Sequence, residues 1–377
     1  MKGIYIFFCP EEKDNSKKTV GIIKKIYSQY YLFKKVLCND FELLNLRRKE
    51  ITSPFLKFFC YLFSNKVFDY SIFRQQKFDY VYIRRVNPNC RSFIYILKLL
   101  KKNNPKCKIL YEIPTYPYDM EYDNIFAKIQ FFIDKLYRKS LVKYIDRIVT
   151  LSEDREIFGC KTLRIANGVD VADIPITKKI MFNPKEISMI AVAQFSFWHG
   201  YERVIEGLYN YYMNGGSCIV KLNLVGDGPD LEKYKTLVEK YNLSNFIIIH
   251  GALSGDKLNK IFDESDVALC SLACHKKNIY LSSELKSREY LCRGLPIISS
   301  TKIDIIPNNF KYIFKVPEDN SNIDINSVIK FVQNIYVNDK IKQNSTVQLV
   351  SSEIRQFAEK NCSMEIAMEK VLDFFKE

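Results

Sequence analysis

A repeated alternation of strand-like and helix-like segments is the feature that most narrowly constrains how this chain can fold. The strand-like segments are short apolar runs, whereas the helix-like segments carry apolar residues at three- and four-residue spacing. In the first half, strands are expected at 3–9, 80–83, 108–113 and 147–151, with helical segments at 17–29 (entered from a loop), 92–102 and 114 to about 143. This alternation predicts an α/β fold with a mostly parallel sheet covered on both faces.

A second alternating series follows a mid-chain turn signal, Asn167-Gly168-Val169-Asp170, and a polar stretch over 174–185. Its strands are expected at 187–193, 218–225, 246–250, 267–271 and 297–300, its helices at 202–212, 230–241 and 257–263, and an amphipathic helix at 361–375. A chain of 377 residues is too long for one ordinary core. Two domains with a boundary after residue 170 are therefore predicted.

The net charge of +14 is concentrated in the first half of the chain. Residues 1–180 contain 34 Lys and Arg against 19 Asp and Glu, whereas the remainder contains 23 basic and 24 acidic residues. A basic half predicts an anionic partner, either nucleic acid or the cytoplasmic membrane leaflet. The alternative is that these charges serve solubility alone.

Residues 55–78 are rich in aromatic side chains interspersed with Lys57, Lys66, Arg74 and Lys77. This composition favours an interfacial segment that dips into anionic lipid. The alternative is a helix packed on the sheet with its basic side chains in water. No apolar run reaches the roughly 18 residues of a membrane span, and the N-terminus is interpreted as a buried strand, not a signal peptide.

The eleven cysteines lack CxxC spacing, which indicates reduced thiols in a cytosolic protein, with neither a disulfide framework nor a zinc site. Neither a DxD motif nor a His/Cys/Asp cluster with metal-ligand spacing is present. The sequence therefore predicts no metal site and no cofactor.

The stretch 282–300 combines a polar loop, a short helix and a Gly-Leu-Pro break. Ser283 is the expected N-cap, and Lys286 in the first turn would add to the attraction of the helix N-terminus for phosphate. Glu289, one turn later on the same face, could accept hydrogen bonds from sugar hydroxyls. This stretch predicts a nucleotide-sugar site. In parallel sheets ligands bind at the carboxyl ends of strands, which adds Gly21, Glu112 and Ser152 as positional candidates.

The motifs in this order resemble the retaining glycosyltransferases of family 4, the "group 1" transferases of the GT-B fold. The resemblance is carried by Gly21, Asn167-Gly168-Val169-Asp170, His199-Gly200, Gly226-Asp227-Gly228-Pro229, His250-Gly251 and the stretch from Lys286 to Pro296. It covers 167–300 most firmly.

The resemblance implies two Rossmann-like domains facing across a cleft. Residues 1–170 would bind the acceptor and 171–360 the nucleotide-sugar, with a helix at 361–377 packing back on the first domain. The implied activity is that of a retaining hexosyltransferase moving sugar from a UDP- or GDP-sugar to a polyprenyl-diphosphate-linked saccharide in bacterial surface polysaccharide (capsule or O-antigen) synthesis. The protein would be cytoplasmic and peripheral at the inner face of the membrane, and its basic first domain would meet the anionic surface.

Roles are implied position by position. Glu289 matches the second glutamate of the EX7E motif, which holds the ribose, and Lys286 is expected at the diphosphate. The first glutamate would fall at Leu281, a departure for which Ser282, Ser283 or Glu284 could substitute. The other implied donor-binding positions are Gly21, Gln194, His199, Gly200, Gly226, Asp227, Gly228, His250 and Ser283.

His199 could donate a hydrogen bond or become cationic, and it is one of two residues expected to take part in catalysis. The other is Glu112, expected to contact an acceptor hydroxyl, with a capping carboxylate as the alternative. Arg84 and Arg85 could meet a phosphate on the acceptor. Without a metal, the helix N-terminus, Lys286 and polar donors would meet the leaving-group charge.

Three other functions remain as alternatives. A non-catalytic GT-B partner subunit that binds acceptor and stabilises a true transferase is motivated by Leu281. A nucleic-acid-binding protein is motivated by charge alone, although no recognisable module supports it and no nucleic-acid partner is expected. A nucleotide-sugar epimerase of similar fold is the third.

Overall fold

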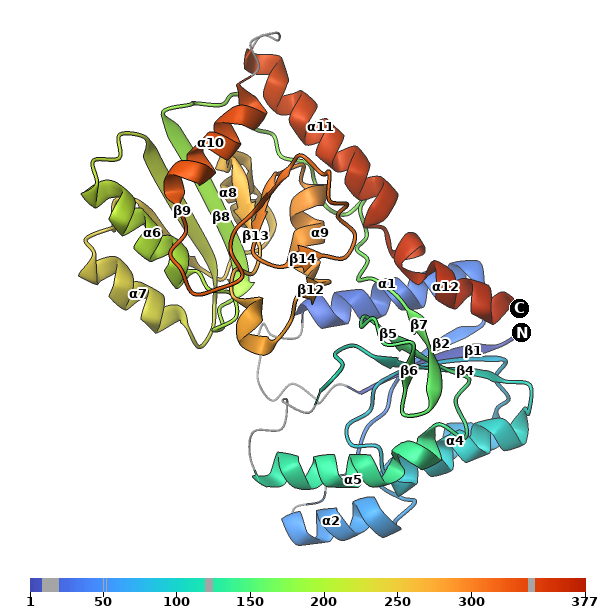
Figure 1. Ribbon diagram of the computed structural model, residues 1–377. Helices are drawn as coiled ribbons and strands as arrows, with labels where there is room; N and C mark the ends of the chain where they lie inside the picture. Colours follow the sequence, from blue (N-terminus) through green and yellow to red (C-terminus); the bar gives the residue numbers. More distant parts are fainter. Residues whose placement is uncertain (9–19, 50, 52, 119–124, 338–342) are drawn as a thin grey trace. The chain divides into compact units, whose positions relative to one another are not determined.

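The computed structural model describes residues 1–8, 20–49, 51, 53–118, 125–337 and 343–377, and the chain divides into two compact units. The first unit contains Met1–Ala166 and Ala367–Glu377, and the second contains Asn167–Ile366 (Figure 1). The boundary after Ala166 lies close to the one expected after residue 170. The end of the chain belongs to the first unit.

The first unit is built on a seven-stranded sheet in the order β2-β1-β3-β4-β5-β7-β6. All neighbours are parallel except the short β6–β7 pair. Its central strands are almost wholly buried, as expected of parallel strands covered on both faces. The strands are β1 (Gly3–Phe7), β2 (Phe41–Asn45), β3 (Tyr80–Arg84), β4 (Lys108–Ile113), β5 (Arg147–Thr150), β6 (Glu156–Ile157) and β7 (Cys160–Arg164).

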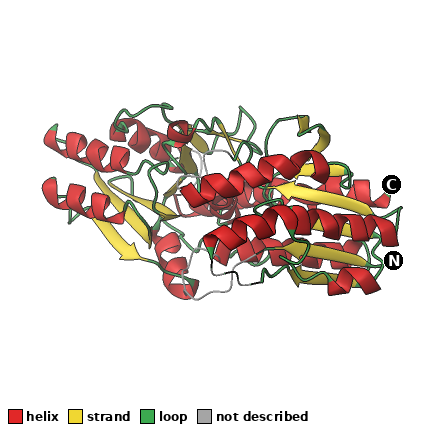
Figure 2. Ribbon diagram, turned by 90° about the horizontal axis from the view of Figure 1, so that it is seen from below, coloured by secondary structure: helices red, strands yellow, loops and turns green. Residues whose placement is uncertain are grey.

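Helices cover this sheet, and Figure 2 shows strands lying between helices. They are α1 (Val20–Val36), α2 (Pro54–Phe63), α3 (Ser71–Gln75), α4 (Arg91–Asn103), α5 (Ile125–Leu141) and α12 (Met364–Lys376). The end of α12 is fixed in the first unit by Phe375, whose ring packs edge-on against Phe33 at 6.0 Å. Lys108 Nζ also donates to the carbonyl of Phe374 at 2.9 Å.

The second unit is built on a six-stranded sheet in the order β10-β9-β8-β11-β13-β15, and every pair is parallel. The strands are β8 (Glu186–Gln194), β9 (Ile219–Asp227), β10 (Ile247–Gly251), β11 (Val267–Leu269), β13 (Ile297–Ser299) and β15 (Ile313–Lys315), with a separate pair of β12 (Leu281–Ser282) and β14 (Lys302–Ile303). The helices are α6 (Glu202–Met213), α7 (Leu231–Lys240), α8 (Gly255–Glu264), α9 (Leu285–Cys292), α10 (Ile325–Tyr336) and α11 (Gln343–Asn361), with a 3-10 turn η3 (Cys274–Lys277).

The structure corrects two expectations about individual elements. The helix expected at 361–375 is not one of them, because it corresponds to α12, which follows a further helix, α11, that ends at Asn361. Gly21 lies in the first turn of α1, not in a loop. Of the segment expected to be helical from 114, residues 119–124 lie outside the described residues and α5 starts at Ile125.

None of the helices in the described part of the chain combines the length and hydrophobicity that a bilayer span requires. The cysteines described are free thiols, and burial raises the pKa of several of them, that of Cys90 to about 11. A raised pKa keeps a thiol protonated and unreactive at neutral pH.

Candidate functional site

The candidate site lies at the carboxyl edge of the six-stranded sheet of the second unit. Because every strand of that sheet is parallel, the loops that follow the strands gather at one edge. Gln194 and Asp227 end β8 and β9 and are direct register partners. Helix α9, with Glu284, Lys286 and Glu289 at and after its start, belongs to the same unit.

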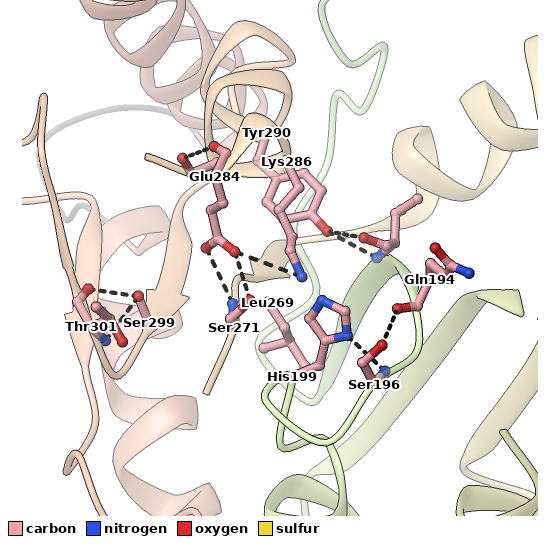
Figure 3. A network of polar contacts seen from close by, with 12 residues as sticks. Gln194, Ser196, His199, Leu269, Ser271, Glu284, Lys286, Tyr290, Ser299 and Thr301 are labelled. Atoms are coloured by element: carbon pink, nitrogen blue, oxygen red, sulfur yellow. Dashed lines mark hydrogen bonds and ion pairs between the residues drawn. The ribbon is translucent and has the colours of Figure 1, made fainter. Parts of the chain in front are cut away.

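A carboxylate and an ammonium group form the centre of the network in Figure 3. Glu284 accepts the hydroxyl of Ser271 at 2.7 Å and its backbone N–H at 3.2 Å. Lys286 Nζ lies 3.8 Å from Glu284 and donates to the hydroxyl of Tyr201 at 3.1 Å. Both charged side chains are 14% exposed, so the pair is shielded from bulk water but still accessible.

The start of α9 corrects the N-cap prediction. The N-cap is Glu284, and Ser283 lies one residue before it. The Ser283 hydroxyl accepts the backbone N–H of Asn167 at 2.9 Å and a hydrogen bond from the buried Arg288 at 3.1 Å. Arg288 also pairs with Asp304. Ser283 therefore joins α9 to the beginning of the unit, and its hydroxyl does not cap the helix.

His199 is buried beside this network and stays neutral. Its ring stacks on Tyr201 at 5.7 Å between centroids with 10° between planes. Burial, followed by the charges of Lys286 and Lys277, lowers the pKa of His199 to about 2. The expectation that His199 could become cationic is therefore wrong, because charging it would require desolvating a cation between two others.

The hydrogen bonding of His199 fixes its tautomer. Its Nδ1 accepts the backbone N–H of Ser196 at 3.0 Å, which requires Nδ1 to be unprotonated. The ring proton is then on Nε2, for which no acceptor is found among the described residues. His199 thus offers one neutral N–H donor close to Lys286 (Figure 3).

The glycines near the strand ends allow backbones to approach closely. A Cβ on Gly226 would lie 1.8 Å from the carbonyl oxygen of Ala193, and one on Gly228 would lie 2.3 Å from that of Phe195. Gly200 has a φ of +65° and a Cβ there would meet Ala273 at 2.6 Å. Gly226 and Gly228 let the end of β9 lie against the end of β8 and the residues that follow it, and Gly200 lets the loop after β8 lie against the loop after β11. The carboxylate of Asp227 accepts the N–H of Gly228 at 2.7 Å and closes this turn.

Glu289 keeps one carboxylate oxygen unused. Arg293 donates twice to Oε1, at 3.2 and 3.3 Å, and no partner for Oε2 is found among the described residues. The side chain of Glu289 is 32% exposed. This oxygen remains available to accept from a hydroxyl. His250, on β10, is held differently, because its Nε2 pairs with Asn223 Oδ1 at 2.8 Å and burial lowers its pKa.

Glu112 belongs to the first unit and is closed off. Its Oε1 accepts from Lys25 and from Arg84, each at 2.9 Å, and its Oε2 accepts from the Tyr82 hydroxyl at 2.9 Å. The residue is 1% exposed. Although desolvation opposes ionisation, Lys25 and Arg84 lower the pKa of Glu112 to about 2. This geometry does not favour the predicted contact with an acceptor hydroxyl, because both oxygens are already occupied.

The structure brings His199, Lys286 and Glu284 into one network, with Gln194 nearby through Ser196, whose hydroxyl donates to the Gln194 carbonyl at 3.3 Å. Ser271 and Tyr201 were not singled out from the sequence. Their signal was positional, since Ser271 follows a strand and Tyr201 follows the His-Gly pair. Within the described ranges, no three His, Cys, Asp or Glu side chains cluster as metal ligands.

The two doubly wound units give the chain the GT-B fold, and solved structures of glycosyltransferases share it. A glycosyltransferase from Rickettsia africae superposes with a TM-score of 0.61 at 15% identity, covering 100% of this chain and 98% of that one. HepE from Anabaena, solved in complex with UDP and glucose, gives 0.57 at 10% identity over 100% of both chains. The lipopolysaccharide outer core galactosyltransferase WaaB gives 0.57 at 13% identity over 100% of both.

At these identities the likeness shows the fold alone. No family model matches the chain. A search of curated proteins likewise finds no match.

Proposed function

We propose that the protein is a retaining hexosyltransferase that uses a UDP- or GDP-sugar as donor, bound by the second unit. The observation that carries this proposal is the network of Lys286, Glu284 and His199 at the carboxyl edge of the parallel sheet. One ammonium group and one neutral N–H donor converge there, beside an α-helix that begins at Leu285. The HepE complex with UDP and glucose supports a donor of this class.

The network fits the charge that develops when the sugar–diphosphate bond breaks. The departing diphosphate gains negative charge, which Lys286 and the Nε2–H of His199 can stabilise by hydrogen bonds. The N-terminus of α9 contributes partial positive charge in the same region. Glu284 orients Lys286, and the free Oε2 of Glu289 would accept from ribose hydroxyls. Gln194, Gly200, Gly226, Asp227 and Gly228 would form the loops around the donor, and Ser283 would hold the start of α9.

In the proposed reaction, the bond from the anomeric carbon to the diphosphate oxygen breaks and a bond to an acceptor oxygen forms on the same face. The acceptor hydroxyl transfers its proton to the departing diphosphate oxygen, and the nucleoside diphosphate leaves. Retention of configuration is taken from the sequence resemblance to family 4. No step requires a metal or a redox cofactor.

The proposed acceptor is a saccharide on a polyprenyl diphosphate, used in the synthesis of a capsule or O-antigen at the inner face of the membrane. The basic first unit supports an anionic acceptor. Arg84 is 15% exposed in its side chain and is held by Glu112, whereas Arg85 stacks over the ring of Tyr118 at 3.4 Å. In this proposal Glu112 positions Arg84. His250 and Gly21 would contribute to donor binding through their backbone groups.

The test is a donor screen followed by product analysis. Nucleotide-sugars are screened by thermal shift, and the best ligand is incubated with a lipid-linked oligosaccharide. We expect release of the nucleoside diphosphate. We also expect a glycosidic product that has the same anomeric configuration as the donor when it is analysed by NMR. An inverted product would overturn retention. No thermal shift with any nucleotide-sugar would overturn the donor site.

One observation favours a second candidate, a non-catalytic GT-B partner subunit. Position 281, where the family has a glutamate, is Leu281 on the short strand β12. A leucine cannot accept a hydrogen bond from the donor sugar. The partner-subunit function predicts a stable complex with a second transferase and no thermal shift with nucleotide-sugars, so the same screen separates the two.

A further inference from the structure

Helix α2 of the first unit exposes a continuous apolar stripe. Phe55, Leu56, Phe59 and Phe63 are between 42% and 73% exposed, although each is large and apolar. The rings of Phe55, Phe59 and Phe63 follow one another along the helix in tilted contacts, with centroids 4.8 Å apart for Phe55–Phe59 and 6.0 Å for Phe59–Phe63. Single exposed apolar residues are common, but a contiguous aromatic stripe marks an interaction surface.

Helix α5, which contacts α2 within the same unit, carries a matching stripe. Its exposed apolar residues are between 37% and 67% exposed. They are Ile125, Phe126, Ile129, Phe132 and Leu136. At about 100° per residue, all of them except Phe126 fall within one narrow sector of the helix. The stripe continues the exposed face of α2, beside which α5 lies in Figure 1.

A groove of about 650 Å³ runs between the two helices. Phe55 and Phe58 line it from α2, and Phe126 and Ile129 line it from α5. Its lining also includes Tyr61 and Ile133, which are buried and belong to the core of the unit. The apolar face formed by the α2 and α5 stripes is therefore continuous and anchored on a rigid base.

The charged side chains that α2 and α5 direct outward are all basic. Lys128, Lys135 and Lys139 are exposed along one border of the α5 stripe, and Lys57 lines the groove. Helix α2 contains no acidic residue. The single acidic residue of α5, Asp134, is 0% exposed and is used internally by Asn89, Tyr118 and Arg138. No acidic side chain of either helix thus faces outward.

We propose that the α2–α5 face inserts into the interfacial region of an anionic lipid bilayer. Aromatic and aliphatic side chains would enter the boundary between headgroups and acyl chains, while the lysine border would contact anionic headgroups. Two copies packed face to face would bring their lysine borders together, and neither α2 nor α5 offers an outward acidic partner, which disfavours self-association. The proposal deepens the membrane association that forms part of the proposed function, by naming the surface responsible.

The experiment is co-sedimentation of the full-length protein with vesicles. Vesicles of phosphatidylcholine alone are compared with vesicles that also contain phosphatidylglycerol. Binding is expected only with phosphatidylglycerol and should weaken as salt rises. The double variant Phe59→Ser/Phe132→Ser is expected to lose at least tenfold in affinity. Both side chains are exposed, so the fold should be retained.

The matched control is Met213→Ser/Ile248→Ser, which removes two exposed apolar side chains from the second unit and should bind vesicles like the unaltered protein. A charge-reversal variant, Lys128→Glu/Lys135→Glu/Lys139→Glu, should lose binding to anionic vesicles while keeping the apolar stripe. Unchanged vesicle binding in either α2–α5 variant overturns the proposal. So does a dimer in solution that Phe59→Ser/Phe132→Ser converts to monomer.

The outcome is separable from that of the proposed enzyme activity. Thermal shift with nucleotide-sugars should be the same for the α2–α5 variants and the unaltered protein, since the donor network lies in the second unit. If nucleotide-sugars fail to bind but vesicle binding depends on the α2–α5 face, the proposed transferase function is wrong and the proposed membrane-binding surface is supported. If nucleotide-sugars bind and vesicle binding does not depend on the α2–α5 face, only the proposal of a membrane-binding surface is contradicted.

Discussion

Each unit places a glutamate near the carboxyl edge of its sheet, and the two glutamates are in opposite situations. Glu112 in the first unit is 1% exposed, with both oxygens bonded to Lys25, Arg84 and Tyr82. Glu284 in the second unit is 14% exposed in its side chain and shares a single lysine, Lys286, at 3.8 Å. One carboxylate is fully enclosed by partners, and the other belongs to an accessible pair.

The difference shows how the same residue type can serve stability or function. A carboxylate whose hydrogen-bonding capacity is used inside the protein fixes its neighbours, and its removal takes a charged partner away from buried cations. A partly exposed pair with a spare ammonium group can turn that group toward a ligand. Enclosure, more than residue identity, separates the two.

The largest expected effect is on stability, from Glu112→Gln. Loss of the charge would remove the buried carboxylate that pairs with Lys25 and Arg84, which are 5% and 15% exposed in their side chains, so the free energy of unfolding should fall by about 3–5 kcal/mol. Urea unfolding measures this loss. The matched Glu284→Gln should cost only about 1 kcal/mol. Equal losses of unfolding free energy in the two variants would contradict the contrast between Glu112 and Glu284.

The pH dependence of the same group follows from its lowered pKa. The pKa of Glu112 is about 2 in the folded protein against 4.5 ordinarily. Its ionisation therefore stabilises the fold above about pH 4.5, and that contribution is lost as the pH falls toward 2. As a control, Glu153→Gln, at a carboxylate 71% exposed, should change stability by less than about 0.5 kcal/mol.

The second effect is on catalysis, from Lys286→Ala. Removing the ammonium group from the Glu284–Lys286 pair should lower kcat/KM for the nucleotide-sugar by about 10²–10³-fold, because the developing diphosphate charge loses its main donor. Steady-state release of the nucleoside diphosphate measures this rate. Lys257→Ala, at an exposed lysine on α8, is the control and should leave the rate unchanged. A tenfold or smaller loss of kcat/KM for Lys286→Ala would contradict the proposed contact between Lys286 and the diphosphate.

The third effect sharpens the comparison through His199. Burial holds its pKa at about 2 when folded, against 6.5 ordinarily. Between these values the unfolded chain binds a proton that the folded protein does not, so stability falls as the pH drops below about 6.5. The unaltered protein should lose up to about 1.4 kcal/mol per pH unit relative to His199→Gln. An NMR titration of His199 with a midpoint near 6.5 would contradict this.

The smallest effect is expected from Glu289→Gln. The oxygen left free by Arg293 would become a weaker acceptor for ribose hydroxyls, raising KM for the donor about five- to tenfold, or roughly 1–1.4 kcal/mol. A comparison of donors with ribose and 2′-deoxyribose tests the contact, because the variant should discriminate less between them. Glu264→Gln, at an exposed carboxylate on α8, is the control. Identical discrimination in the variant and the unaltered protein would exclude the contact.

Much of the fold could be predicted because parallel strands and amphipathic helices have local periodic signatures. The strands at β4, β8 and β13 and the helix α9 lie within a few residues of their expected positions. The helices α10 and α11 were not expected, since the polar and apolar residues there gave no clear boundary before the tail. Helix ends were less predictable, as the replacement of Ser283 by Glu284 at the N-cap shows.

The site could be predicted only as far as its residues are neighbours in sequence. Lys286 and Glu289 were recognisable because they lie one turn apart. The enclosure of Glu112 was not, because its partners Lys25 and Arg84 are 87 and 28 residues away. The neutrality of His199 likewise depends on its burial and then on the charges of Lys286 and Lys277, which come from distant segments. Burial and charge environment are set by tertiary contacts that no local pattern encodes.

The return of α12 to the first unit has a consequence for biosynthesis. Met1–Ala166 emerge from the ribosome long before Ala367–Glu377, yet both segments build the same unit. Until the last helix arrives, Phe33 and Tyr80 lack the ring of Phe375 that covers them. The second unit can complete its fold first during translation, and the first unit stays partly uncovered until α12 has been synthesised.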